Sequence, residues 1–116
     1  MPIVRVRKNS NFNKIIELSN LAIGLKHSVA KGLNVPGCRA GLLSASDVEV
    51  YFDNIQPMDR CSKNIEIIIE ANFVFERLVN LEERAKLITE EAKRWIPSNY
   101  TFFVWVRLAH GAYMEG

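Results

Sequence analysis

A strand–helix–strand pattern that occurs twice in 116 residues limits the fold of this chain more than any other feature. Residues 3–7 alternate between valines and other side chains, which predicts a strand with one apolar face. Residues 11–31 change to helical spacing, and Gly32 follows where a helix commonly ends in a left-handed residue. Residues 47–53 alternate again. The apolar stripe of this first unit, about residues 2–53, comprises Ile15, Leu18, Ala22, Leu25 and Val29.

The second half of the chain repeats the plan over about residues 64–116. Isoleucines at every second position predict a strand from residue 65, and Asn80 with Glu83 has the spacing of a capping box at a helix start. Residues 100–108 predict the last strand. Two right-handed crossovers then give an α/β (α+β) fold in one domain, residues 1–116, with a four-stranded mixed sheet and two helices on one face.

The sheet face opposite the helices carries both charge and apolar surface. If the first strands of the two units are neighbours, Arg5 and Arg7 can pair with Glu66 and Glu70 across them. The same face also carries a set of larger apolar side chains, which is too much apolar surface for an open monomer. We therefore expect other copies of the chain to cover it. The apolar set comprises Ile3, Tyr51, Ile68, Phe103 and Trp105.

Composition excludes several classes of protein. A net charge of +2 gives no sign of nucleic-acid binding, and no apolar run approaches the ~20 residues that span a bilayer. The N-terminus lacks the apolar segment of a signal peptide, so we expect a cytoplasmic protein. In that compartment Cys38 and Cys61 are predicted to be free thiols, with neither a disulfide nor a metal site.

Pro2 is the residue with the clearest chemical potential. Removal of Met1 exposes a secondary amine at the start of the first predicted strand. Burial and neighbouring cations lower the pKa of such an amine from its ordinary value of about 8, which makes it a general base near neutral pH. The alternative is that Met-Pro starts the chain, as it starts many proteins, without any catalytic role.

Taken together, these features resemble the tautomerase superfamily, whose fused two-unit members include macrophage migration inhibitory factor and the cis-3-chloroacrylic acid dehalogenases. The resemblance depends on the proline at position 2, the layout of both units, and the final strand with its short C-terminal segment. It implies a homotrimeric barrel with three sites between subunits, a small-molecule substrate, no metal and no organic cofactor. The matching segments are residues 1–4, 64–71, the helix from Asn80, 104–107 and 113–116.

The resemblance implies that Pro2 is the general base for keto–enol isomerisation of a small, anionic carbonyl compound or unsaturated acid. Arg107 and Arg77 are the candidates to stabilise the negative charge, and Arg39 is a third candidate for binding substrate. Each arginine has a structural alternative, as a solvated charge or a carboxylate partner. Two other functions stay open: a hydratase or dehalogenase acting on unsaturated acids, and a non-catalytic trimeric binding protein.

Further candidates come from the last strand and the C-terminus. Phe103 and Trp105 can line an apolar pocket, or pack in the core or a trimer interface. Tyr113 and Glu115 can supply a proton or position a water molecule, as a hydratase requires. One departure concerns Glu49, which takes the place of an arginine in the short isomerases of this superfamily. A carboxylate there repels an anionic substrate and argues against dicarboxylates.

Overall fold

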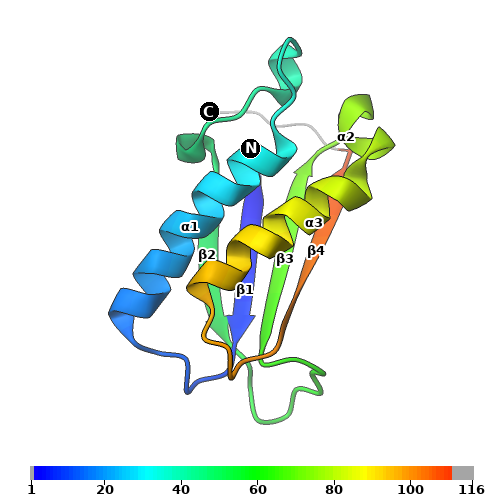
Figure 1. The fold of residues 1–116 in the computed structure, drawn as a ribbon. Coiled ribbons are helices and arrows are strands. Elements are labelled where there is room, and N and C mark those ends of the chain that lie inside the picture. Colours follow the sequence, from blue (N-terminus) through cyan, green and yellow to red (C-terminus); the bar gives the residue numbers. More distant parts are fainter. Residues whose placement is uncertain (1, 111–116) are drawn as a thin grey trace, which may run out of the picture.

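Four strands form one mixed sheet, and two long helices cover one face of it (Figure 1). The computed structural model describes residues 2–110. The strand order is β2-β1-β3-β4; β1 is parallel to β2 and antiparallel to β3, and β3 is parallel to β4. This confirms the predicted fold class. The elements are β1 (Ile3–Lys8), α1 (Ile15–Leu33), β2 (Glu49–Asn54), β3 (Ile65–Asn72), α2 (Phe75–Val79), α3 (Leu81–Ala92) and β4 (Phe102–Ala109), with 3₁₀ turns at Arg39–Gly41, Ala45–Asp47 and Lys93–Trp95.

The core lies between the sheet and the helices. Alternate residues of the central strands point towards the helices and are fully buried, as period-2 alternation requires. One stripe of α1 and one stripe of α3 pack on them. Because β1 and β3 are central, the start of β1 is held between two other strands. The buried contacts involve Val4 and Val6 of β1, Ile65, Ile67 and Ile69 of β3, Leu21, Leu25 and Val29 of α1, and Ile88 and Ala92 of α3.

Helix α1 differs from its prediction at both ends. It begins at Ile15, because the chain first makes a turn in which the Phe12 N–H donates to the Asn9 carbonyl and the Phe12 ring is buried. Ile15, which the apolar spacing assigned to the buried stripe, is 82% exposed. The helix then continues through Gly32, which does not adopt the predicted left-handed conformation.

Gly32 instead allows α1 to approach α3. A β-carbon at this position would lie 2.6 Å from Cγ1 of Ile88. Gly32→Ala is therefore expected to destabilise the protein by about 1 kcal/mol, because overpacking costs about 1–3 kcal/mol and the gain in helix propensity is at most about 1. Urea unfolding measures the difference. In an Ile88→Ala background the same change should be neutral or stabilising; equal losses in both backgrounds would contradict the steric explanation.

The predicted capping box at the start of α3 is wrong. Asn80 precedes the helix, but its side chain makes no hydrogen bond to the helix backbone. Its Oδ1 accepts from Nε of Arg84 at 2.6 Å instead.

The start of β2 also differs from its prediction, because Asp47 belongs to a 3₁₀ turn in which its carboxylate accepts from the Ser44 N–H. That hydrogen bond lowers the pKa of Asp47.

The face without helices carries one of the two predicted ion pairs. Arg7 lies opposite Glu66, and its Nη1 is 3.1 Å from the Glu66 carboxylate; its Nη2 also contacts Asp59 at 2.7 Å. The antiparallel register, however, sets Arg5 opposite Ile68, so it does not meet Glu70. The guanidinium of Arg5 lies 5.7 Å from the centre of the Tyr51 ring. We call the sheet face opposite the helices the open face.

Two further properties concern the class of protein. No helix in the stretch from residue 2 to residue 110 is long and apolar enough to cross a membrane. Cys38 and Cys61 are both free, and burial, followed by the Glu66 carboxylate, raises the pKa of the Cys61 thiol.

Candidate active site

Pro2 lies at the end of the sheet where β1 begins, and it is buried. Its carbonyl oxygen accepts from the Glu49 N–H at 3.1 Å, which ties the first residues of β1 to the start of β2. Because β3 and β4 run antiparallel to β1, their last residues reach the same end of the sheet (Figure 1). The C-terminus of α1 and the short helix α2 also lie there. We call this region the Pro2 end.

The open face at the Pro2 end carries charged side chains in one row across the sheet. Ile3 is in register with Glu49 on β2 and with Glu70 on β3, and Glu70 is in register with Arg107 on β4. Residues in register point to the same face of a sheet. The two strands beside β1 therefore each carry a carboxylate next to the residue that follows Pro2, and the guanidinium lies one strand farther away.

Arg107 is available to a ligand. Its side chain is 54% exposed, and its Nη2 lies 3.8 Å from the Glu70 carboxylate, which is longer than a direct hydrogen bond. The guanidinium also lies 5.8 Å from the centre of the Trp105 ring, within the range of a cation–π contact. An exposed and loosely paired guanidinium can bind a carboxylate without breaking a buried interaction.

Glu49 has a neutral partner. The Tyr51 hydroxyl donates to its carboxylate at 2.8 Å, two residues along the same strand. That hydrogen bond, and then the negative charge of Glu49, raises the pKa of the Tyr51 hydroxyl. Both side chains are accessible on the open face. The sequence identified Glu49 by its departure from an arginine, but it did not indicate this pair.

Arg77 belongs to α2 and is only 1% exposed, so it is not a solvated surface charge. Its guanidinium donates to three backbone carbonyls, those of Leu33 at 2.8 Å, Asn72 at 2.9 Å and Gly41 at 3.2 Å. Burial, with a further contribution from the nearby Arg84 charge, lowers its pKa. These contacts favour a structural role for Arg77, as a donor to backbone carbonyls, over a catalytic one.

Arg84 completes this arrangement, and sequence reasoning missed it. Its Nη1 donates to the carbonyls of Gly32 at 2.9 Å and Asn34 at 3.1 Å. Together with Arg77 it supplies donors to the last carbonyls of α1, which have no partner within the helix. Cations also interact favourably with the negative end of the helix dipole. The two arginines fix the segment after α1 at the Pro2 end, and their only sequence signal is a spacing of seven residues.

The remaining candidates are not all at the Pro2 end. Arg39 is exposed in the 3₁₀ turn after α1. Trp105 lies on the open face one row from Arg107 and is 57% exposed. Phe103 is half-buried and in register with Glu66, two rows from Arg107. Tyr113 and Glu115 lie outside the described residues.

Within the described part of the chain, no three histidine, cysteine or acidic side chains are grouped as a metal site would require.

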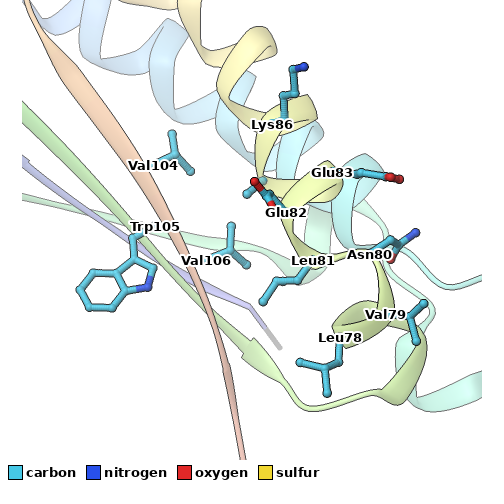
Figure 2. Close-up of a pocket in the computed structure, with 11 residues that line it drawn as sticks. Leu78, Val79, Asn80, Leu81, Glu82, Glu83, Lys86, Val104, Trp105 and Val106 are labelled. Carbon is cyan, nitrogen blue, oxygen red and sulfur yellow. The ribbon is translucent and has the colours of Figure 1, made fainter.

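An open groove of about 810 Å³ lies between the outer edge of β4 and the helices α2 and α3 (Figure 2). Leu81 points from α3 towards β4 in this groove, whereas the Trp105 ring points away from it. Apolar side chains form its floor and charged side chains from the first turns of α3 form its rim. The rim residues are Glu82, Glu83 and Lys86.

Comparison with known proteins identifies the fold. No family model matches the sequence, and no curated protein matches it. Solved structures do match over nearly the whole chain. A 5-carboxymethyl-2-hydroxymuconate delta-isomerase matches with a TM-score of 0.67 at 9% identity, covering 100% of this chain and 86% of the isomerase. A malonate semialdehyde decarboxylase matches with a TM-score of 0.66 at 11% identity, covering 98% of this chain and 92% of the decarboxylase.

A third match is a symmetric trimer of a fused 4-OT protein, with a TM-score of 0.62 at 10% identity, covering 93% of this chain and 85% of that protein. These proteins belong to the tautomerase superfamily. The chain therefore has the tautomerase-superfamily fold, as the resemblance of its sequence predicted. At these identities the matches establish the fold alone.

Proposed function

We propose that this protein is a tautomerase-type enzyme in which Pro2, after removal of Met1, is the general base for keto–enol isomerisation of a small carbonyl compound or unsaturated acid. The observation that carries the proposal is the position of Pro2: a buried proline at the start of a central strand, in the tautomerase-superfamily fold. Burial disfavours the charged ammonium and lowers the pKa of the amine. A neutral secondary amine then accepts a proton from carbon and returns it elsewhere on the substrate.

Arg107 is the proposed partner of the substrate's negative charge. It shares the Pro2 end and presents an exposed guanidinium. Such a group binds a carboxylate and stabilises the enolate charge that develops as carbon loses its proton. Arg39, Trp105 and Phe103 are kept as proposed substrate-binding residues. Arg77 has the weakest claim, since its donors already contact the backbone.

Self-association as a homotrimer is part of the proposal. The open face exposes Trp105 and Tyr51 and has no covering layer within residues 2–110, and such a surface is commonly buried by another subunit. The fused 4-OT protein of the same fold is a symmetric trimer. Sites between subunits would add residues of a second copy to the Pro2 end.

The second candidate function is addition of water to an unsaturated acid. It is favoured by Glu49 and Glu70, because two nearby carboxylates stabilise the ammonium form of Pro2, which would then donate a proton. The malonate semialdehyde decarboxylase of this fold has both decarboxylase and hydratase activities, and it was also solved as a variant in which its first-position proline is alanine. If water is added, Tyr113→Phe and Glu115→Gln should reduce hydration far more than enol–keto conversion.

The experiment that tests the proposal compares two forms of the protein. One has lost Met1, as verified by mass; the other carries an uncleaved N-terminal extension that converts the Pro2 nitrogen into an amide. Enol–keto conversion of phenylpyruvate should occur with the first form and be absent with the second. Equal activity in both forms would rule out the amine as the base. A lack of activity in both would favour the non-catalytic binding protein.

A further inference from the structure

The charges closest to the start of β1 on the open face are negative. β1 lies between β2 and β3, and in the row of Ile3 these neighbours present Glu49 and Glu70. Neighbouring strands are about 4.8 Å apart, so Arg107 on β4 is about twice as far from β1 as either carboxylate is, measured along the sheet. A ligand at Pro2 therefore meets two carboxylates before it reaches the guanidinium.

The two carboxylates differ in their partners. Glu70 lies 3.8 Å from Arg107, so its charge is partly balanced by a cation. Glu49 accepts a hydrogen bond from the neutral Tyr51 hydroxyl, and among residues 2–110 it takes part in no ion pair. The nearest guanidinium in the adjoining row, that of Arg5, lies over the Tyr51 ring. Within residues 2–110 of one copy of the chain, Glu49 thus presents a negative charge without an ion-pair partner on the β2 side of Pro2.

We infer that Glu49 determines the charge of the substrate: the Pro2 end accepts compounds with one carboxylate, directed to Arg107, and rejects those with a second carboxylate. This inference rests on the proposed function for the location of the site. A monocarboxylate can turn its uncharged end towards Glu49. A dicarboxylate brings a second negative charge closer to that of Glu49, and like charges at such distances in a partly buried site repel strongly.

The test uses two four-carbon acids as probes, butyrate with one carboxylate and succinate with two. Their dissociation constants are measured by calorimetry on the Met1-free protein, on Glu49→Gln and on Asp53→Asn. Asp53 is the matched control, because it lies on the same face of β2 four residues farther from Pro2. Glu49→Gln is expected to tighten succinate relative to butyrate by about tenfold. Asp53→Asn is expected to change that ratio less than twofold, because Asp53 lies farther from the ligand and salt screens its charge.

Three results would overturn the inference. The first is an equal ratio of the succinate and butyrate dissociation constants in Glu49→Gln and in the unmodified protein. The second is an equal change of that ratio in Glu49→Gln and Asp53→Asn, and the third is that neither acid binds. The calorimetry does not depend on turnover. A protein that shows the expected ratios but does not convert phenylpyruvate would refute the proposed function and leave the charge selectivity standing, whereas an active protein with unchanged ratios would refute Glu49 alone.

Discussion

Pro2→Ala is expected to reduce enol–keto conversion at least about 100-fold, since a positioned general base contributes about 10²–10⁴-fold to a rate. Alanine retains an amine at the N-terminus, and its small side chain also permits removal of Met1. The substitution therefore replaces the secondary amine with a primary amine and removes the ring that fixes its orientation, but it leaves the nitrogen free. The rate constant per site, measured on protein whose mass confirms loss of Met1, gives the comparison.

The Pro2→Ala protein should keep its fold. β1 is held by strands on both sides, and the Pro2 contact to Glu49 uses a backbone carbonyl that alanine also has. Circular dichroism and the assembly mass should match those of the unmodified protein. Turnover within threefold of that protein, from a folded variant, would exclude Pro2 as the base. If Pro2→Ala loses its fold together with its activity, Pro2→Gly, which also has a free N-terminal amine, replaces it in the test.

Arg77→Ala is expected to lower the free energy of unfolding by about 3–5 kcal/mol. The side chain is almost fully buried, and its removal takes a donor from the carbonyls of Leu33, Asn72 and Gly41, of which only the Gly41 carbonyl keeps the Val35 N–H as a second donor. An unsatisfied buried polar group costs about 1–3 kcal/mol, and the lost packing adds to this. Urea unfolding followed by circular dichroism measures the change in midpoint and slope.

Arg39→Ala is the matched control for Arg77→Ala. Both arginines belong to the region around the segment after α1, but Arg39 is exposed. Its substitution should change the free energy of unfolding by no more than about 0.5 kcal/mol. Similar losses from both substitutions, or a loss below 1 kcal/mol from Arg77→Ala, would show that the three carbonyl contacts do not stabilise the fold.

The sheet and its two covering helices could be predicted from the sequence because they depend on local periodicity. The alternation of Ile65, Ile67 and Ile69 and the spacing of Leu25 and Val29 are visible without any tertiary information. The ends of the elements could not be predicted in the same way. Gly32 looks like a helix end, but it lies within α1, where its missing side chain makes room for Ile88 of α3, a residue far away in the sequence.

The side chains at the Pro2 end were predictable only in part. Pro2, Glu49 and Arg107 follow from strand alternation and position, so their place in the sheet could be anticipated. The role of Arg77 could not be anticipated, because its partners Leu33 and Gly41 are 44 and 36 residues away in the sequence. Ion pairing depended in the same way on the register between β1 and β3, which paired Arg7 with Glu66 but separated Arg5 from Glu70.

The most direct test of Pro2 as a base is the pH dependence of enol–keto conversion by the Met1-free protein. A base is active when neutral, so kcat/KM should rise with pH through the pKa of the amine, at a value below about 8, and then level off. The opposite slope, activity that falls as pH rises through that range, would contradict a proline base and indicate that Pro2 acts as a protonated acid beside Glu49 and Glu70.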